Sequence, residues 1–284
     1  MIDRVQCIDV DLNRDETIYI TPLADLHLDS PLCDYDTLAA ILKDRHKRLP
    51  NHRVIITGDT SDLILPVDLR RHRQSLNIIT SGQDEFLMDR IKFVVGRLRG
   101  LGCKIDLVGE GNHEHSVVKY HGVDPTTLYA SELGAIRGGY HGTLNYRLHY
   151  KGKHRVNYTI DYHHGAWGGE YAKGYLGAQR WFMQSEGWDL AVYGHNHATR
   201  FDPETRFRQL PNSYRRVECI VRMVNVGSWS ERGHKDARLT SHADLKGHRA
   251  HPRIAFLVRV TLRRKRSNLA AGLPEFYFDH TVEG

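Results

Sequence analysis

No apolar run in this sequence approaches the roughly 20 residues that a membrane-spanning helix requires. The opening Met1-Ile2-Asp3-Arg4 does not begin a signal peptide. Cysteine is scarce, and Cys7, Cys33, Cys103 and Cys219 lack the spacing of a zinc knuckle or of a disulfide framework. Internal repeats and low-complexity tracts are also missing. We therefore expect neither a membrane protein nor a disulfide-stapled one, and we expect a cytoplasmic location.

The content of the chain fits one folded α/β domain over residues 1–284. Hydrophobic residues make up 40% of the sequence, which is enough for a substantial core. Strand-like runs end in Gly- or Asp-containing turns at residues 18–20, 53–57, 104–108, 158–162 and 188–193. Helical spacing of apolar residues occurs between them, at residues 34–49, 83–98, 124–133 and 176–185. Strand and helix alternate up to residue 134, which indicates an α/β layer.

The later part of the chain adds mainly strands. Residues 142–162 form two adjoining strands around a turn at Lys151-Gly152-Lys153, and further strand-like runs lie at 217–226, 254–262 and 276–278. The pattern predicts two packed mixed sheets flanked by helices, as a four-layer α/β/β/α sandwich. We expect loop insertions near 63–82 and 198–216, and a basic β segment over 250–284.

Charge is distributed unevenly along the chain. Residues 206–284 contain 16 Lys and Arg against 7 Asp and Glu, a net charge of +9, whereas residues 1–205 have a net charge of −3. A second basic cluster includes Arg70 and Arg71 in the loop at 63–82. An isolated basic run is usually only solvated surface. Basic clusters can also steer and hold polyanions, and nucleic acid is the commonest such partner.

Five short segments contain residues that a two-metal site needs. They are Asp25-Leu26-His27, Gly58-Asp59-Thr60-Ser61-Asp62, Gly111-Asn112-His113-Glu114, His163-His164-Gly165 and Gly194-His195-Asn196-His197. Their carboxylates, amide and imidazoles suit Mn, Fe or Zn. Each segment follows an apolar strand, and ligands in α/β sheets gather at the carboxyl ends of strands. The sequence therefore predicts a metal site at one edge of the sheets.

The chemistry of such a site follows from its ligands. Two divalent cations about 3.5–4 Å apart can bind a bridging hydroxide and the oxygens of a phosphate. One carboxylate must bridge the ions, and Asp59 is the natural choice. A separate imidazole near the leaving oxygen would be a general acid, and His113 fits that role. Taken alone, each segment has an ordinary explanation as a turn or cap. All of those explanations would have to hold together for the site to be absent, so we favour the metal site.

In order and spacing, these segments resemble the motifs of the calcineurin-like metallophosphoesterases: D-x-H, G-D-x-x-D, G-N-H-D/E, H-G and G-H-x-H. Asn225-Val226-Gly227-Ser228 also resembles the N-x-G-S segment that often follows them. The stretch from Ala24 to Pro31 is closest to the opening of bacterial and phage DNA repair nucleases of that superfamily. Similar openings also occur in small-molecule pyrophosphatases and cyclic-nucleotide phosphodiesterases.

The resemblance implies roles for individual residues. One metal would be held by Asp25, His27 and His197, the other by Asn112, His164 and His195, and Asp59 would bridge them. His113 would be the acid, with Asp62 orienting it, and Asn112 and His113 would also contact the substrate. His164 is chosen over His163 because the family histidine precedes glycine, and neighbouring side chains on a strand point to opposite sides. The ions would be two divalent metals, with Mn²⁺ favoured over Fe, Zn or Ni.

The substrate is the more open question. The Arg that follows the second motif in phosphoprotein phosphatases is replaced here by Leu63, which argues against that branch. We expect hydrolysis of phosphodiester bonds in DNA or another nucleic acid. The alternatives are a phosphomonoesterase, or a nucleotide or cyclic-nucleotide phosphatase acting on a small phosphoester or phosphoprotein, and a scaffold protein whose metals serve structure only. Arg70, Arg71, Trp167 and Tyr171 are further candidate substrate contacts, although loop packing explains the aromatic pair equally well.

Overall fold

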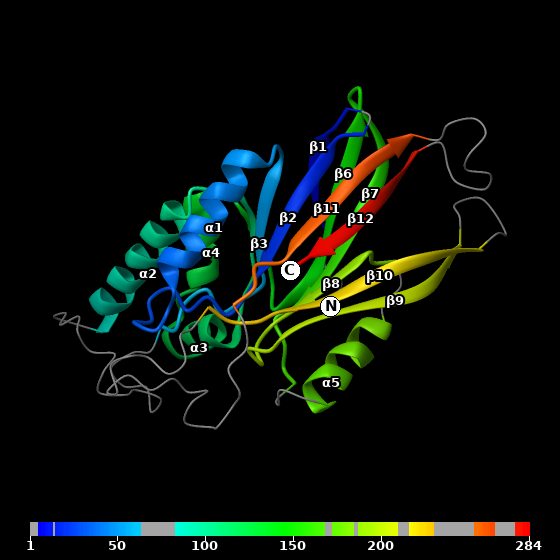
Figure 1. Ribbon diagram of the computed structural model, residues 1–284. Coiled ribbons are helices and arrows are strands. Elements are labelled where there is room, and N and C mark those ends of the chain that lie inside the picture. Colours follow the sequence, from blue (N-terminus) through cyan, green and yellow to red (C-terminus); the bar gives the residue numbers. More distant parts are fainter. Residues whose placement is uncertain are drawn as a thin grey trace.

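The computed structural model describes residues 5–13, 15–63, 83–167, 172–184, 187–209, 216–229, 253–264 and 276–284. In this part of the chain the strands form two six-stranded sheets, and the helices lie outside them (Figure 1). Both sheets mix parallel and antiparallel pairs, so each combines α/β crossovers with hairpins.

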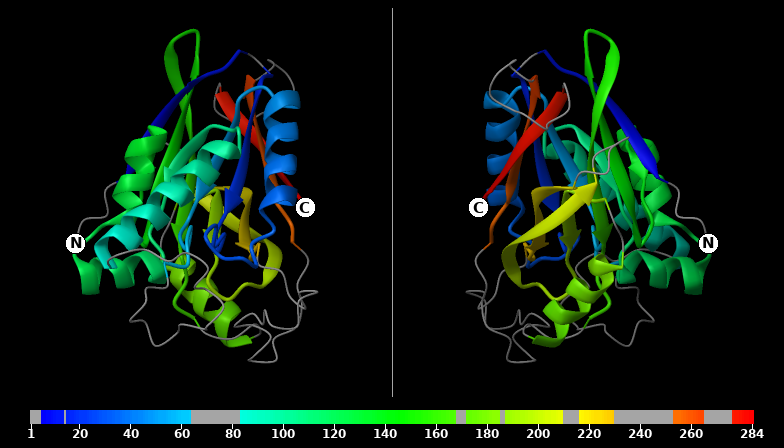
Figure 2. Two further views of the ribbon diagram at one scale, coloured as in Figure 1. Left: turned by 90° about the vertical axis from the view of Figure 1, so that its left-hand side faces the viewer. Right: turned by 90° about the vertical axis from the view of Figure 1, so that its right-hand side faces the viewer.

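The first sheet has the strand order β1-β6-β7-β8-β10-β9. Its strands are β1 (Gln6–Asp11), β6 (His141–Tyr150), β7 (Lys153–His163), β8 (Leu190–Tyr193), β9 (Thr199–Gln209) and β10 (Arg216–Val226). β7, β8 and β10 run parallel to one another. The β6–β7 hairpin turns through Lys151 and Gly152, both with positive φ, which is the geometry of a tight hairpin turn. This hairpin projects beyond the rest of the sheet (Figure 2).

The second sheet has the strand order β12-β11-β2-β3-β4-β5. Its strands are β2 (Thr17–Leu23), β3 (His52–Ile56), β4 (Ile105–Val108), β5 (Ile136–Arg137), β11 (Leu257–Arg264) and β12 (Phe276–Glu283). β2 to β5 are parallel, whereas β11 pairs antiparallel with both β2 and β12. β2, β3 and β4 therefore end at the same edge of the sheet.

Three buried apolar clusters define the layers. Residues such as Ile20, Ile160 and Val258 fill the space between the two sheets. On the outer face of the second sheet, a cluster packs α1 (Tyr35–Arg48), α2 (Gln83–Gly100), α3 (Asn112–His121) and α4 (Pro125–Leu133) against the strands. On the first sheet, Phe182 of α5 (Ala172–Met183) packs against Tyr193 and Met223. Figure 1 shows this separation, with α5 on the opposite side from α1, α2 and α4.

The predicted four-layer α/β/β/α arrangement of two mixed sheets is confirmed. The prediction of a loop insertion at 198–216 is wrong for residues 199–209, which form β9 at the edge of the first sheet. An edge strand with one neighbour need not show an apolar face, and it tolerates Pro203. β11 and β12 take up the described part of the predicted basic β segment, while residues 64–82 lie outside the described residues.

Among the described residues, no helix combines the length and the apolar composition that a membrane crossing needs.

Candidate metal centre

The five predicted segments follow β2, β3, β4, β7 and β8, and backbone hydrogen bonds join their loops. The amide of Asp25 donates to the carbonyl of Gly58 at 3.1 Å, which ties the loop after β2 to the loop after β3. The amide of Gly194 donates to the carbonyl of His164 at 3.0 Å. Across the two sheets, the amide of His195 donates to Asp25 Oδ2 at 2.7 Å. The strand ends of both sheets therefore meet at one site.

The side chains of these loops form adjoining groups of acids and imidazoles. Asp25, His27 and His197 each offer a ligand atom within 4.8 Å of the others, and so do Asp59, His164 and His195. A third group within the same limit, His27, Asp62 and His113, overlaps the first. The structure thus brings six of the seven predicted metal-binding residues into two groups.

The seventh predicted ligand, Asn112, completes the second group. Its Oδ1 lies 3.0 Å from His164 Nε2 and 2.8 Å from His195 Nδ1. Asp59 Oδ2 lies 3.2 Å from the same His164 nitrogen. Two imidazole nitrogens, an amide oxygen and a carboxylate oxygen converge on one point, which is a donor set that a divalent transition metal accepts.

Buried atoms of the first group have no hydrogen-bond partner among the described residues. They are Asp25 Oδ1 and both ring nitrogens of His27, of which Nδ1 lies 2.7 Å from Asp62 Oδ1 as an ion pair. The two atoms that face no such partner are Asp25 Oδ1 and His27 Nε2. Burying such polar atoms without a partner costs free energy, and native proteins usually satisfy them. A cation bound between them would satisfy both, so the residues present fit a metal ion.

The electrostatics of the site point to the same need for positive charge. Burial would lower the pKa of His27, but the carboxylates of Asp62, Asp59 and Asp25 outweigh it and raise that pKa to about 10. Burial is likewise outweighed at His164, whose pKa is raised to about 9, chiefly by Asp59. The acids therefore favour the protonated forms of His27 and His164, whereas burial lowers the pKa of His195 and of His197. A divalent ion would supply the compensating charge in place of the protons on His27 and His164.

Backbone strain is concentrated at the same residues. Left-handed backbone occurs at Asp25, His27, Asp59, His195 and His197, with φ of 50°, 46°, 46°, 73° and 56°. This conformation is uncommon for residues other than glycine and costs about 1–2 kcal/mol each. Such strain persists where surrounding contacts impose it, and it gathers at functional sites.

Two glycines allow the backbone to approach the carboxylates. A β-carbon at Gly111 would overlap Asp59 Oδ1, and one at Gly194 would overlap Asp25 Oδ2. Only glycine fits at these positions without displacing a predicted ligand.

Asp62 does not hold His113 in the way that we expected. Its Oδ1 lies 2.7 Å from His27 Nδ1 but 3.9 Å from His113 Nδ1. The carboxylate therefore faces the ligand His27. His113 Nδ1 instead lies 2.7 Å from the backbone carbonyl of Asp62. The reason is that the amides of Asp62 and Leu63 both donate to the buried carboxylate of Asp29, at 2.5 and 3.1 Å, which sets the turn of the loop.

His163 and His164 point to opposite sides of β7, as strand alternation requires. His164 joins the second metal group, whereas the ring of His163 stacks on His141 with centroids 5.7 Å apart. Trp167, a predicted substrate contact, packs on His163 at 4.6 Å between centroids, which fits the packing interpretation. Arg70, Arg71 and Tyr171 lie outside the described residues.

Several supporting residues were not assigned a role from the sequence. Glu114 is fully buried, and its carboxylate accepts from the amides of Asp59, Ser61 and Gly111 at 3.0–3.1 Å. The amide of His164 donates a hydrogen bond to the backbone carbonyl of Tyr140 at 2.8 Å. The hydroxyl of Tyr140 donates to the carbonyl of Gly165, also at 2.8 Å. Glu114 stands in a recognised motif and could have been suspected, whereas no sequence signal marks Tyr140.

The segment Asn225-Val226-Gly227-Ser228 also supports the site. Ser228 Oγ donates to the carbonyl of Asp25 at 3.0 Å. Asn225 Nδ2 donates to Asn196 Oδ1 at 2.6 Å, which holds the loop between His195 and His197. The chain is therefore a two-sheet α/β protein with a buried acid–imidazole centre at its strand ends.

No protein-family model matches the sequence, and no curated protein matches it either. The fold is similar to that of a NAD nucleotidase from Haemophilus influenzae, with 10% identity and a TM-score of 0.42, covering 95% of this chain and 50% of that one. It is also similar to a 5'-nucleotidase precursor from Thermus thermophilus, with 10% identity and a TM-score of 0.38, covering 94% of this chain and 54% of that one.

A third similar structure is a metallophosphoesterase from Sphaerobacter thermophilus, with 11% identity and a TM-score of 0.34, covering 88% of this chain and 89% of that one. The chain spans about half the length of the two nucleotidases. These likenesses are distant, and we base the function on the geometry of the centre.

Proposed function

We propose that this chain is a dinuclear metal-dependent phosphoesterase that hydrolyses phosphodiester bonds. The observation that supports it is the pair of adjoining, largely buried groups, Asp25, His27, His197 and Asp59, His164, His195, with His113 beside them. Asn112 adds its amide oxygen to the second group. Acids, imidazoles and one amide in two adjacent sets are the ligands of a two-metal phosphoester site.

In this proposal the residues have separate roles. Asp25, His27 and His197 hold one ion, Asn112, His164 and His195 hold the other, and Asp59 is shared. When bound, two such ions lower the pKa of a coordinated water and neutralise charge on the phosphate. The Asp62 carboxylate lies 2.7 Å from His27 Nδ1 and would orient this ring, which leaves Nε2 available for the ion.

His113 is placed to protonate the leaving oxygen. Its Nδ1 donates to the backbone carbonyl of Asp62, because a carbonyl oxygen only accepts, so that nitrogen carries a hydrogen. Its amide donates to Asp59 Oδ1 at 3.0 Å, and its Nε2 lies 3.9 Å from Asp59 Oδ2 and so faces the centre. With the Nδ1 hydrogen held by that carbonyl, Nε2 carries a proton only in the imidazolium form. In that form it would give this proton to a leaving-group oxygen and become neutral imidazole, which is general acid catalysis.

The proposal of a diester over a monoester depends on the resemblance of residues 24–31 to repair nucleases, and the comparison of the two model substrates below tests it. A nucleic acid is the finer proposal for the substrate. It depends on the net charge of the chain and on the resemblance of residues 24–31 to repair nucleases.

The test is hydrolysis of bis-p-nitrophenyl phosphate by protein stripped with a chelator and reloaded with Mn²⁺. We expect turnover with metal, none without it, and a lower rate on p-nitrophenyl phosphate. Asp59→Asn removes the shared carboxylate and should abolish turnover. His113→Ala should lower kcat by about 10²–10⁴-fold, the usual contribution of a general acid. Nicking or trimming of DNA by the same preparation tests the finer proposal.

His115→Ala is the matched control, since His115 is an exposed imidazole two residues further along α3 and belongs to neither metal group. It should retain activity. Metal-replete protein that is inert on all phosphodiesters and phosphomonoesters would overturn the proposal in favour of a scaffold whose metals are structural. A protein that binds no transition metal would overturn the metal assignment itself.

A further inference from the structure

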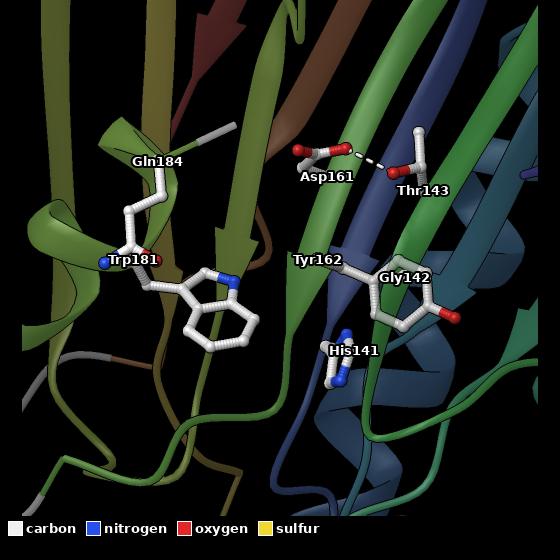
Figure 3. A pocket seen from close by; sticks show the side chains of 7 residues that line it. All are labelled: His141, Gly142, Thr143, Asp161, Tyr162, Trp181 and Gln184. Carbon is white, nitrogen blue, oxygen red and sulfur yellow. Dashed lines mark hydrogen bonds between the residues drawn. The ribbon is translucent and has the colours of Figure 1, made fainter. Parts of the chain in front are cut away.

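A pocket separate from the two metal groups lies on the outer face of the first sheet, between α5 and the strands β6 and β7 (Figure 3). Its volume is about 160 Å³. Figure 3 shows Trp181 and Gln184 on the α5 side of this space, and His141, Thr143 and Asp161 on the strand side. The proposed catalysis uses none of these side chains.

The walls of the pocket combine flat rings with a few polar groups. The Trp181 indole and the His141 imidazole contact each other at 5.3 Å between centroids. Further along, Asp161 Oδ1 accepts a hydrogen bond from Thr143 Oγ1 at 2.7 Å. Rings with a small number of placed polar groups are typical of ligand sites. Pockets for drug-sized ligands measure about 300–1,000 Å³, so the smaller volume here matches one ring system and not a whole nucleotide.

A continuous series of ring contacts connects this pocket to the metal centre. His164, a proposed ligand, contacts Tyr140 at 5.3 Å between centroids, and Tyr140 contacts His163 at 5.5 Å. His163 in turn contacts Trp181 at 4.6 Å and stacks on His141. Three ring-to-ring contacts therefore separate the second metal group from the wall of the pocket. A substrate whose phosphate lies at the metals could place a neighbouring group here.

We propose that this pocket binds the nucleobase of the substrate, an inference that rests on the phosphoesterase function proposed above. The Trp181 indole would stack on the base, since every base presents a π-face. Asp161 would accept hydrogen bonds from the base edge, because an ionised carboxylate only accepts and offers about four lone-pair positions. The preferred bases are therefore those with an exocyclic amino group, such as adenine, over thymine, whose one N–H donor, N3–H, stands between two carbonyl oxygens that repel a carboxylate.

The experiment compares substrates with and without a base. The quantity measured is the ratio of kcat/KM on the p-nitrophenyl ester of 5'-AMP to kcat/KM on bis-p-nitrophenyl phosphate. Trp181→Ala should lower this ratio about tenfold through KM, as expected for the loss of one stacking contact, and Trp181→Phe should keep most of it. Asp161→Asn should reduce the preference for the 5'-AMP ester over the 5'-TMP ester. Met183→Ala, an exposed change on the same helix, is the control and should leave the ratio unchanged.

Two further measurements are needed. One distinguishes a nucleic-acid strand from a mononucleotide as the source of the base, and the other distinguishes failure of the base site from failure of the proposed phosphoesterase function. Short single-stranded oligonucleotides are assayed beside the mononucleotide esters, and dependence on Trp181 for the oligonucleotides alone assigns the pocket to a strand. Adenosine binding to metal-free protein is followed by saturation-transfer NMR. Equal ratios in wild type and Trp181→Ala, or no adenosine binding by wild type, overturn the nucleobase site even if phosphodiesters are hydrolysed. Adenosine binding that Trp181→Ala abolishes, in a protein inert on every ester, overturns the proposed function and leaves the base site standing.

Discussion

At the scale of single residues, Asp62 contacts His27 with its carboxylate and His113 with its backbone carbonyl. Its carboxylate lies 2.7 Å from His27 Nδ1, and its backbone carbonyl lies 2.7 Å from His113 Nδ1. Replacing the side chain therefore removes only the contact with the proposed metal ligand. The contact with the proposed acid stays, because the carbonyl belongs to the backbone.

This difference makes Asp62→Asn informative. Partners of metal-binding histidines typically contribute about 10–100-fold to metal affinity. We expect Asp62→Asn to raise the Mn²⁺ concentration for half-maximal activity by a factor in that range, with kcat largely recovered at saturating Mn²⁺. Activity measured against Mn²⁺ concentration gives both quantities.

His113→Ala provides the comparison, since it should lower kcat and leave the Mn²⁺ requirement unchanged. If Asp62→Asn behaved like His113→Ala, with kcat low at every Mn²⁺ concentration, the carboxylate would act on the acid, and the assignment to His27 would be wrong.

Most of the centre could be predicted at this scale, because the ligand types stand in short motifs after apolar strands. Strand alternation also predicted that only one of His163 and His164 faces the centre, and the structure places His164 there. The partner of the Asp62 carboxylate could not be predicted. It depends on a turn that Asp29 imposes from another loop, through two hydrogen bonds that no local pattern encodes.

At the scale of elements, a buried ion pair fastens α2 to the loops of the centre. Arg90 of α2 is 4% exposed, and its Nε lies 3.3 Å from Asp29 Oδ2. Burial and the charge of Asp62 raise the pKa of Asp29, while Arg90 opposes them. Arg90 therefore supports the charged form of the carboxylate that receives the amides of Asp62 and Leu63.

Removing one member of a buried pair leaves an uncompensated charge, which costs about 3–5 kcal/mol. We expect Arg90→Met to lower the free energy of unfolding by an amount in this range, measured by urea denaturation. Arg48→Met removes the exposed arginine that pairs with Asp44 on α1, and exposed pairs contribute about 0–1 kcal/mol. Equal effects of the two changes would show that burial does not determine the contribution of the Arg90 pair.

The elements themselves differ in how far the sequence predicts them. α4 follows from local signals, since Asp124 caps the helix through the amide of Thr127 and Pro125 begins it. β9 does not, because residues 199–209 show no apolar alternation. It becomes a strand through pairing with β10, and that pairing depends on the rest of the sheet.

At the scale of the whole molecule, acid should destabilise the fold through His52. This histidine begins β3, is 2% exposed, and exchanges a hydrogen bond with Thr21 Oγ1 at 2.9 Å. Burial, together with the charges of Arg45 and His46 on α1, lowers its pKa to about 4 from 6.5. Between these values the unfolded chain takes up a proton and the folded protein does not, so the contribution to stability is lost as the pH falls from 6.5 toward 4.

We expect His52→Gln to flatten the pH dependence of the free energy of unfolding across this window by about 1–3 kcal/mol relative to wild type. Urea denaturation at several pH values measures it. His154→Gln, at an exposed position of β7, controls for the loss of an imidazole. An unchanged pH dependence in His52→Gln would show that His52 titrates alike in the folded and unfolded protein.

The net charge of +6 gives less guidance at this scale than the sequence suggested. Two described arginines of the basic C-terminal part already contact acidic or aromatic side chains of the protein itself. Arg263 pairs with Asp15 and Asp279, and Arg206 lies over the ring of Trp188 at 4.1 Å and pairs with Glu204. Counting charges along the chain cannot reveal such pairing, because partners such as Asp15 and Trp188 lie elsewhere in the sequence. The two-sheet architecture was predictable, because it depends on many apolar strand-like runs together and not on any single residue contact.

The convergence of strand ends from both sheets has a mechanical consequence. One proposed ion takes Asp25 and His27 from a loop of the second sheet and His197 from a loop of the first. The other takes Asp59 and Asn112 from loops of the second sheet and His164 and His195 from loops of the first. An ion in either place would cross-link loops of the two sheets. Its binding energy would then add to the apolar core and to the hydrogen bond from His195 to Asp25, which already join the two sheets. A chelator would thus remove the activity and would also weaken the attachment of the two sheets to each other at this edge.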